Sequence, residues 1–339
     1  MVDTTNPEAN RQLPIALDAM GGDNAPSEIV KGAVTAYEQY GIPVILTGRA
    51  DAIGDTRGIP VVDCSEVIGM DDDPGGSVRR KKDSSLVRAA ELVRDGAASA
   101  MVSAGNTGAT MASALFRMGR VKGILRPAIA TPIPNSTDTP TVFLDSGANV
   151  DCSANMLVQF AIMGAVFSRA RYGANKPRVA ILSNGEEPTK GTADVKETHK
   201  LMADLESPEF TFIGNVEGRD LMQGAADVVV TDGFTGNVAL KALEGSLKFF
   251  IDTLMGAIGH DESTQAAGRV LFEQLAPTID KLDPDNVGGA MLLGVDGICL
   301  ISHGSSSSKA IVSALRVAND LVKSDLQEHI RAAIRPVDG

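Results

Sequence analysis

The 339-residue sequence has no tryptophan, and aromatic residues make up only 4% of it. It also lacks a long hydrophobic run. The longest, AMLLGVDGICLIS at 290–302, is interrupted by Asp296 and is too short to cross a bilayer. The polar residues 1–12 predict a disordered extension and no secretory signal peptide. We therefore expect neither a membrane-spanning protein nor an exported one.

Positive charge is also scarce. The formal net charge is −12, so nucleic-acid binding is not expected without a local basic patch. The three cysteines, Cys64, Cys152 and Cys299, are widely spaced, and no Cys-x-x-Cys is present. This odd number argues against a disulfide framework and a structural zinc site, and favours the reducing cytoplasm.

Two common phosphate-binding signatures are missing after the first predicted strand. That strand leads into ALDAMGGDNAP at 16–26, which has neither the Gly-x-Gly-x-x-Gly spacing of dinucleotide-binding loops nor the lysine of a Walker loop. A nicotinamide dehydrogenase is therefore a disfavoured alternative. Asp18 and Asp23 raise the question of what such an acidic turn holds. A divalent metal is one open answer, although no histidine or third ligand accompanies these acids.

What the sequence does contain is short apolar runs that alternate with helical patterns. Helices are predicted over 27–39 and 84–95. The predicted strands lie at 14–18, 43–47, 60–63, 100–103, 128–131, 141–144, 178–182, 210–213, 227–231 and 297–301. This alternation predicts an α/β fold with a mostly parallel sheet between helices, as a single domain over 13–335.

The predicted turns after these strands are rich in glycine, serine, threonine and asparagine. They are GGDNAP (21–26), SAGNTGAT (103–110), LDSGANVD (144–151), SNGEEPTKGT (183–192), TDGFTGN (231–237) and SHGSSSSK (302–309). In a parallel sheet, turns at the carboxyl ends of the strands form the ligand-binding edge. Glycines allow close backbone approach, and helix N-termini attract anions, so the turns together predict a site for a small anion such as phosphate.

These motifs, in this order and together with VRRKKDSSL (78–86) and GANVDC (147–152), resemble the bacterial phosphate acyltransferase (PlsX) family. The resemblance extends over residues 13–320. It implies transfer of a long-chain acyl group from acyl-acyl carrier protein to inorganic phosphate, which gives acyl phosphate for phospholipid synthesis. It also implies a three-layer αβα sandwich similar to that of phosphotransacetylases.

The resemblance further implies a homodimer, with no metal or cofactor, in the cytoplasm and peripherally on the inner face of the cell membrane. A downstream glycerol-phosphate acyltransferase would receive the acyl phosphate there.

Four residues are candidates for catalysis. Lys190 can neutralise phosphate or the oxyanion, and Asn237 can donate its amide to the same oxygens, unless it caps a helix. Asp232 can orient a donor or take the phosphate proton, although an Asx turn would also explain it. His303 can protonate the departing sulfur, but a structural histidine that caps the next helix is the favoured interpretation.

Further residues are expected to form the phosphate or substrate cradle. Glycine backbone would face the anion, while Asp18 and Asp23 would accept hydrogen bonds from neighbouring loops or from Lys190 and fix the pocket's shape. Turn chemistry alone is the alternative for this set. It consists of Asp18, Gly21, Gly22, Asp23, Ser103, Gly105, Asn106, Thr107, Gly108 and Gly236.

No nucleophilic triad is recognisable in the sequence. Phosphate is itself an oxygen nucleophile, and a thiol of pKa about 8.5 leaves with little acid help, so direct transfer is the simpler hypothesis. Cys152 has no adjacent base to lower its pKa and is not expected to accept the acyl group.

Two basic groups can attract the acidic carrier protein. One is the run Arg79, Arg80, Lys81 and Lys82; the other consists of Arg117, Arg120, Lys122 and Arg126. A solvated surface is the alternative explanation for such charges.

A helical hairpin is expected over 238–278. Its apolar stripe consists of Leu240, Leu243, Leu247, Phe250, Leu254 and Ile258, widened by Phe249, Ile251 and Met255. The tip, near Leu254, Met255 and Ile258, is expected to touch the bilayer, with core or dimer packing as the alternative.

Two rival functions remain open. A short-chain phosphotransacetylase that acts on coenzyme A thioesters could use the same pocket, but it would leave the apolar hairpin and the basic run unexplained. A noncatalytic scaffold for lipid enzymes would leave the phosphate-loop motifs unexplained.

Overall fold

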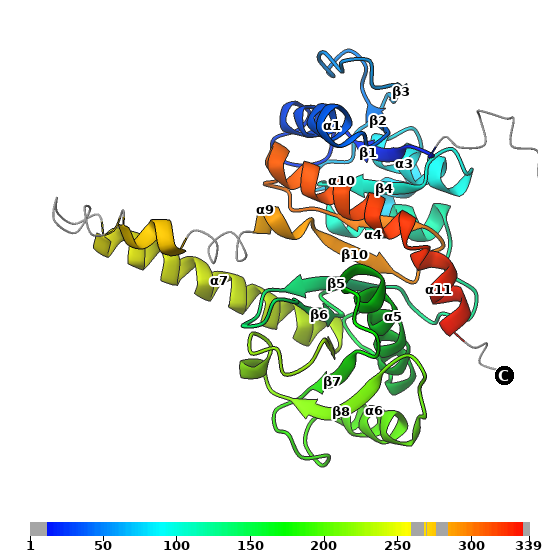
Figure 1. Ribbon diagram of the computed structural model, residues 1–339. Coiled ribbons are helices and arrows are strands. Elements are labelled where there is room, and N and C mark those ends of the chain that lie inside the picture. Colours follow the sequence, from blue (N-terminus) through cyan, green and yellow to red (C-terminus); the bar gives the residue numbers. More distant parts are fainter. Residues whose placement is uncertain (1–11, 259–267, 269, 276–283, 335–339) are drawn as a thin grey trace, which may run out of the picture. The chain divides into compact units, whose positions relative to one another are not determined.

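The alternating segments form strands and helices in the computed structural model of the chain (Figure 1). The structure describes residues 12–258, 268, 270–275 and 284–334. The chain divides into two compact units. Unit 1 consists of the residues up to Pro127 and those from Gly288 onward, and unit 2 is Ala128–Val287. A domain can contain more than one compact unit, so the single domain over 13–335 stays a prediction. The expected disorder of residues 1–12 falls almost wholly outside the described residues.

Unit 1 contains a sheet in the order β3-β2-β1-β4-β11-β10. All neighbours are parallel except the antiparallel pair β10 and β11. The strands are β1 (Ile15–Asp18), β2 (Val44–Gly48), β3 (Val61–Asp63), β4 (Ala100–Ser103), β10 (Ala290–Leu293) and β11 (Ile298–Ile301). Strand β10 was not predicted, because the stretch 290–302 was treated as one apolar run, although Gly294, Asp296 and Gly297 mark the reversal between β10 and β11.

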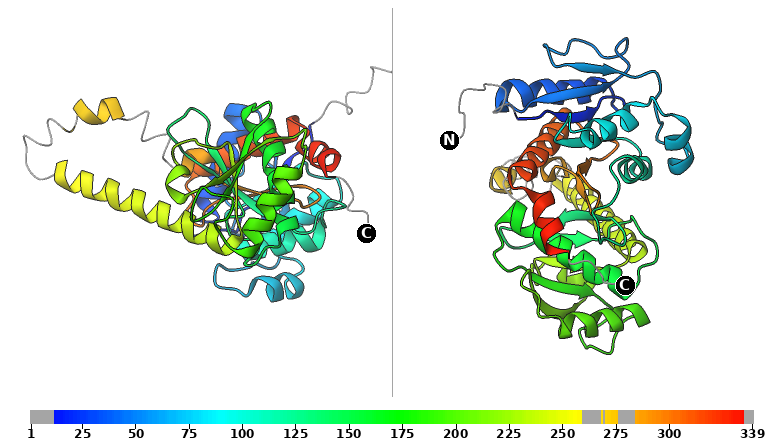
Figure 2. Two further views of the ribbon diagram at one scale, coloured as in Figure 1. Left: turned by 90° about the horizontal axis from the view of Figure 1, so that it is seen from below. Right: turned by 90° about the vertical axis from the view of Figure 1, so that its right-hand side faces the viewer.

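Helices cover both faces of the unit 1 sheet (Figure 2). On one face α1 (Ser27–Tyr40) packs against α10 (Ser308–Lys323), which continues into α11 (Leu326–Ala333). On the other face α2 (Pro74–Arg80) and α3 (Ser85–Arg94) pack against α4 (Thr107–Arg117). The predicted helices 27–39 and 84–95 are therefore present within one residue at each end.

The strands of unit 2 lie in the order β5-β6-β9-β7-β8. Neighbouring strands are parallel except for the pair β5 and β6. The strands are β5 (Ala128–Ile133), β6 (Thr141–Leu144), β7 (Arg178–Leu182), β8 (Thr211–Val216) and β9 (Val228–Val230). The helices are α5 (Ala154–Tyr172), α6 (Ala193–Asp204), α7 (Gly233–Ile258) and α9 (Pro284–Val287), with a 3₁₀ turn at Gly218–Asp220.

Side chains alternate across the unit 2 sheet and so build two core layers. Leu144 and Val228 face α5, where a Cβ on Gly164 would lie 2.7 Å from Val228 Cγ1. Phe143 and Val229 belong to the buried cluster on the other face, against which Leu240 of α7 packs. In both units a mostly parallel sheet lies among packed helices, so the predicted α/β class is confirmed.

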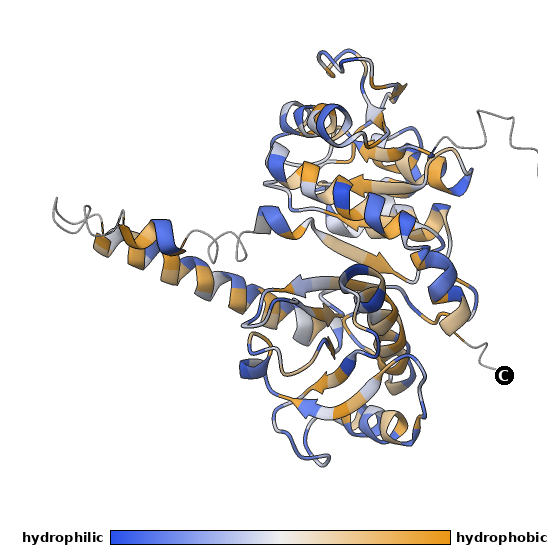
Figure 3. Cartoon of the chain, viewed as in Figure 1, coloured by the Kyte–Doolittle hydropathy of each residue, from blue (hydrophilic) through white to orange (hydrophobic). Residues whose placement is uncertain are grey.

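Helix α7 projects from unit 2 (Figure 1), and hydrophobic residues recur along its length (Figure 3). Its base and its outer part differ in burial. Leu240 and Leu243 pack against the unit 2 core. Further out, Phe249 is 73% and Phe250 63% exposed. The projecting helix is confirmed, while much of the expected hairpin turn lies outside the described residues. No helix in the described part of the chain is long and apolar enough to span a membrane.

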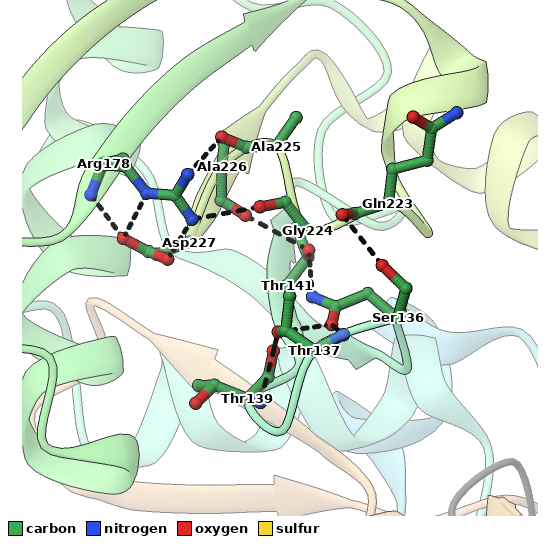
Figure 4. Close-up of polar contacts among 11 residues, drawn as sticks. Ser136, Thr137, Thr139, Thr141, Arg178, Gln223, Gly224, Ala225, Ala226 and Asp227 are labelled. Atoms are coloured by element: carbon green, nitrogen blue, oxygen red, sulfur yellow. Dashed lines mark hydrogen bonds and ion pairs between the residues drawn. The ribbon is translucent and has the colours of Figure 1, made fainter. Parts of the chain in front are cut away.

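The amino ends of β7 and β9 are joined by an ion pair (Figure 4). Arg178 Nη2 lies 2.8 Å from Asp227 Oδ1, and Arg178 Nη1 donates to Ala225 O at 2.8 Å. Burial alone would raise the pKa of Asp227, but the hydrogen bonds from Arg178 outweigh it and the pKa is lowered. This network stabilises the sheet edge opposite the glycine-rich turns.

The substitution Asp227→Asn is expected to lower the free energy of unfolding by about 1 kcal/mol at neutral pH, because the ion pair is partly exposed. A lowered carboxylate pKa contributes stability above the unfolded-state pKa and loses it as the pH falls through the folded-state pKa. The difference between parent and variant should therefore shrink on acidification. Thermal melts from pH 3 to pH 7 measure it, and a difference that grows towards pH 3 would contradict this account.

Candidate active site

In unit 1, the turns that follow the adjacent strands β1, β4 and β11 touch through their backbones. Asp23 N donates to Gly304 O at 2.7 Å. A Cβ on Gly21 would lie 2.7 Å from Gly105 N, closer than side-chain atoms normally approach. Glycine is therefore required at this crossing. The expectation that these three turns gather at one sheet edge is confirmed.

Asp18 lies beneath these turns and is only 2% exposed. Its Oδ2 accepts a hydrogen bond from Ser103 Oγ at 2.8 Å, and its Oδ1 accepts one from Met20 N at 3.1 Å. Burial raises the pKa of Asp18, although hydrogen bonds from Ser85, Ser103 and the backbone oppose the shift. Asp18 therefore links the turns after β1 and β4 by hydrogen bonds beneath them. A bound metal is not needed to explain it, and among the described residues no cluster of metal ligands is found.

The turn after β4 combines structural and exposed residues. Asn106 Oδ1 caps α4 by accepting from Ala109 N at 3.0 Å, while its Nδ2 donates to Met70 O at 2.7 Å. A Cβ on Gly108 would lie 2.8 Å from Pro74 Cγ. Thr107 is exposed at the start of α4. Of the predicted cradle residues in this turn, Thr107 is thus the one whose side chain faces solvent.

The turn after β11 carries His303, which is exposed. Ser307, not His303, caps α10 through a hydrogen bond to its hydroxyl from Ala310 N at 3.3 Å, so the helix-capping interpretation of His303 is wrong. Ser308 N donates to Glu28 Oε2 at 2.8 Å, and this bond holds the pKa of Glu28 below its usual value. The N-terminus of α10 therefore already holds a carboxylate of this chain.

In unit 2, Lys190 is exposed on the turn between β7 and α6. A Cβ on Gly185 would lie 2.7 Å from Lys190 Cγ, so the lysine stem runs closely across this glycine. Gly191 N donates to Asn184 Oδ1 at 2.8 Å, and Thr192 Oγ1 caps α6 by accepting from Val195 N at 3.2 Å. The turn is thus fixed on both sides of the lysine.

A second network holds this turn from β8. Lys190 N and Asn215 Nδ2 both donate to the carbonyl of Glu187, each at 3.0 Å. Asn215 Oδ1 lies 3.0 Å from His199 Nδ1, so the imidazole donates through Nδ1. Asn215 on the edge strand β8 and His199 on α6 therefore set the course of the Lys190 turn.

The turn after β9 leads directly into α7. Asp232 caps the helix, since its Oδ1 and Oδ2 accept from Thr235 N and Thr235 Oγ1, each at 2.8 Å. Gly233 N donates to Asn149 O at 2.7 Å, and Gly236 N donates to Asp232 O at 2.9 Å. These N–H groups of the first turn are already engaged. Asn237 follows as an exposed side chain, and it does not cap the helix.

The strand order places three turns of unit 2 together. β6, β9 and β7 are adjacent and parallel, and neighbouring strands lie about 4.8 Å apart. The turns with Asp145, Asp232 and Lys190 therefore start side by side at one sheet edge.

Sequence reasoning missed Asp145 and Asn215. Asp145 lies in the LDSGANVD turn, where its position as the first acid at the carboxyl end of a buried strand matches that of Asp18 at the end of β1. That parallel was the available signal. Asn215 lies inside β8, and no sequence pattern marks it.

The three cysteines are buried. Burial raises the pKa of Cys152 to about 12, and the nearby Asp145 adds to the effect. Burial likewise raises the pKa of Cys64 to about 11 and of Cys299 to about 12. At neutral pH these thiols are protonated and poor nucleophiles, which agrees with the expectation that Cys152 is not an acyl acceptor.

Helix α2, which ends in the first basic run, packs against α4, whose last residue is Arg117 of the second basic group. The Arg79 guanidinium lies 5.1 Å from the ring centroid of Phe116, which is 46% exposed. Lys81 Nζ lies 2.6 Å from Asp72 Oδ2 and donates to Val67 O, so it is tied into the loop before α2. Arg79, Arg80 and Lys82 are exposed, as are Arg120, Lys122 and Arg126.

Known proteins resemble the chain over nearly its full length. A family model described as "Fatty acid synthesis protein" matches residues 13–329. A phosphate acyltransferase of Pelotomaculum thermopropionicum is 46% identical over 333 residues, which cover 96% of both chains. One of Leptospira biflexa is 44% identical over 327 residues, 94% of this chain and 95% of its own.

The chain belongs to the phosphate acyltransferase family. It is therefore an acyltransferase, and the resemblance carried by its motifs is confirmed. Among solved structures, the EutD phosphotransacetylase from Staphylococcus aureus matches with a TM-score of 0.61 over 92% of this chain and 94% of its own, at 16% identity. This likeness confirms the phosphotransacetylase-like fold.

The buried Asp18 gives a prediction for Asp18→Asn. A carboxyl group whose pKa is raised by folding contributes stability below its unfolded-state pKa and loses it as the pH rises through the folded-state pKa. The difference in the free energy of unfolding between the parent and Asp18→Asn should therefore change in favour of the variant from pH 4 to pH 8. Urea unfolding at several pH values measures it. A gap that widens as the pH rises would mean that the carboxylate is favoured by its surroundings instead.

Proposed function

We propose that the chain transfers a long-chain acyl group from acyl carrier protein to inorganic phosphate and releases acyl phosphate for phospholipid synthesis. Membership of the phosphate acyltransferase family supports the transfer to phosphate. The structural observation that carries the assignment is the exposed Lys190, held on a braced turn at the same sheet edge as the start of α7. A fixed cation beside a helix N-terminus suits an anionic nucleophile.

The reaction proceeds by direct attack. An oxygen of phosphate attacks the thioester carbonyl carbon and forms the C–O bond of a tetrahedral oxyanion. The C–S bond then breaks, and the sulfur leaves with the bonding electrons and takes up a proton. The products are acyl phosphate and the free carrier thiol. The buried, protonated thiols of this chain support a path without an acyl-enzyme.

In this proposal the side chains of Lys190 and Asn237 bind the phosphate anion. The first-turn N–H groups of Gly233, Thr235 and Gly236 already have acceptors, so the contacts to phosphate fall to side chains. The ammonium of Lys190 neutralises the phosphate or the oxyanion, and the amide of Asn237 donates to it. Asp232 has the orienting role, because both of its oxygens hold Thr235.

The turns of unit 1 have a supporting role in substrate binding. Asp18, Ser103 and the glycines at 21, 22 and 105 shape the turns, and Gly236 does the same in unit 2. The predicted site residues of unit 1 that are exposed to solvent are Asp23, Thr107 and His303. His303 stays a candidate from the sequence for protonating the departing sulfur.

The substitution Lys190→Ala is expected to lower kcat/KM for phosphate by about 100-fold, because one charged transition-state contact is lost. The assay uses palmitoyl-acyl carrier protein and labelled phosphate, and hydroxylamine traps acyl phosphate as the hydroxamate. Lys196→Ala, an exposed lysine on α6, is the matched control. Full activity of Lys190→Ala would move the site elsewhere. Product from palmitoyl-coenzyme A but not from the carrier thioester would favour the coenzyme A alternative.

The exposed basic surface of α2 is the proposed dock for the acidic carrier protein. The contact of Arg79 with Phe116 supports this proposal, because it joins the α2 cations to those that follow α4 and leaves an aromatic ring at the surface. Lys81 has a structural role instead, since Asp72 holds it.

Charge reversal by Arg79→Glu with Arg80→Glu is expected to raise KM for palmitoyl-acyl carrier protein about tenfold or more and to leave KM for phosphate unchanged. Arg94→Glu is the control, because Arg94 is also exposed at a helix end but pairs with Asp95. Steady-state kinetics with each substrate varied in turn separate the effects. Equal changes in both KM values would count against a carrier dock.

The outer part of α7 is the proposed membrane contact of a cytoplasmic, peripherally bound homodimer. Its exposed phenylalanines support contact with acyl chains, where acyl phosphate passes to a glycerol-phosphate acyltransferase. Of the predicted tip, Met255 is 50% exposed, while Leu254 and Ile258 are half-buried. The same apolar surface would also serve dimer packing.

Phe250→Glu with Leu254→Glu is expected to abolish flotation with phosphatidylcholine vesicles, because two charges would enter the acyl region. Lys241→Gln with Lys248→Gln changes the net charge equally on the polar face of α7 and should leave flotation intact. Light scattering reports the oligomeric state of each variant. Undiminished flotation of the first variant would remove the membrane role, and dissociation of a dimer with undiminished flotation would favour dimer packing.

A further inference from the structure

Asp145 is the most heavily hydrogen-bonded carboxylate at the unit 2 sheet edge. It is fully buried, at 0% exposure. Its Oδ1 accepts from Ile129 N at 3.0 Å and from Ala148 N at 3.0 Å. Its Oδ2 accepts from Asn149 N at 2.7 Å and from Asn149 Nδ2 at 2.9 Å. The chain thus curls around this one side chain over residues 145–149.

This curled segment lies directly against the first turn of α7. Gly233 N donates to Asn149 O at 2.7 Å. A Cβ on Gly236 would lie 1.9 Å from Asp145 O, and one on Gly233 would lie 2.5 Å from Asn149 O. No side chain fits at either helix position without moving the 145–149 segment. The segment and the helix start therefore behave as one packed piece.

The same segment borders Asn237. Gly147 has φ +136, a conformation that glycine readily adopts, and a Cβ there would lie 3.5 Å from Asn237 Cβ and 3.6 Å from Asn237 Oδ1. The backbone at Gly147 therefore forms one wall beside the Asn237 side chain. Any shift of the segment moves the wall against which the amide rests.

We propose that Asp145 is a positioning residue for acyl transfer to phosphate, acting through residues 145–149 on the start of α7 and so fixing where the Asn237 amide points. The inference deepens the proposed function and rests on it. Asp145 itself contacts no substrate. Its effect reaches the reaction through Gly147, Gly233 and Gly236.

The chemistry of the surroundings explains why a carboxylate is needed. The groups facing Asp145 are N–H donors, and a carboxylate offers only acceptors. In Asp145→Asn, the shape is kept, but one oxygen becomes an NH₂ that confronts N–H groups. The donors of the 145–149 segment must then move away from that position. A misplacement of about 1 Å in a reacting group can lower a rate about 100-fold.

A double-mutant cycle tests the coupling. The variants are Asp145→Asn, Asn237→Ala and the combination, each assayed by hydroxamate trapping with phosphate varied, after its folded fraction has been measured by thermal melting. Asp227→Asn is the matched control. It alters a carboxylate that also accepts a backbone N–H, at the opposite end of β9, and it is likewise combined with Asn237→Ala.

We expect Asp145→Asn to lower kcat/KM for phosphate by about tenfold to 100-fold per folded molecule. The combination with Asn237→Ala should be hardly slower than the slower single variant, because both changes remove the same contact. Asp227→Asn should lower only the Tm and leave kcat/KM per folded molecule unchanged. The double variant of Asp227→Asn with Asn237→Ala should therefore be no slower than Asn237→Ala. A merely structural role of Asp145 would lower the Tm and leave kcat/KM per folded molecule unchanged.

Three results overturn the inference while the proposed function stands: parent-like kinetics of Asp145→Asn, multiplicative effects in the cycle, or an Asn237→Ala variant with full activity. If Asp145→Asn does not fold, Asn149→Ala takes its place. It removes one hydrogen bond to Asp145, and a smaller loss that is again non-multiplicative with Asn237→Ala is expected. A parent protein that makes no phosphate-dependent hydroxamate overturns both the function and the inference.

Discussion

Hydrogen bonds accepted by two buried carboxylates hold the glycine-rich turns of this protein in place. Asp18 is the last residue of β1 in unit 1, and Asp145 directly follows β6 in unit 2. Each accepts bonds from the turn that it begins, and burial raises the pKa of both. A buried carboxylate destabilises the folded state unless hydrogen-bond donors surround it. The donors around each acid therefore determine the path of the backbone after the strand.

A second set of hydrogen bonds, at the helix starts, decides which groups remain available for chemistry. The start of α7 is occupied by Asp232 and Asn149, and the start of α10 by Ser307 and Glu28. Helix N-termini are usual anion sites, but here their N–H groups largely have partners within the chain. In the proposed function, exposed side chains on the braced turns, Lys190 above all, therefore bind phosphate.

Much of the fold could be predicted because apolar runs and glycine-rich turns are local signals. Every predicted strand is present, whereas β10 was missed because 290–302 was treated as one apolar run despite the turn residues Gly294, Asp296 and Gly297 within it. The contacts of the candidate site residues were harder to predict. The sequence singles out Lys190 and Asn237 by their motifs, but it cannot show that Lys81 is tied to Asp72, that Ser307 instead of His303 caps α10, or that Asn215 braces a distant turn. Those facts depend on contacts between residues far apart in sequence.

The central claim is that phosphate held by these turns attacks the thioester directly, with no acyl-enzyme. Rapid-quench measurement of free carrier thiol, from palmitoyl-acyl carrier protein mixed with stoichiometric enzyme in the absence of phosphate, tests it most directly. The account predicts no thiol release until phosphate is added, and no mass increase of the enzyme. A burst of about one thiol per chain without phosphate, with an acyl group found on the protein, would contradict it.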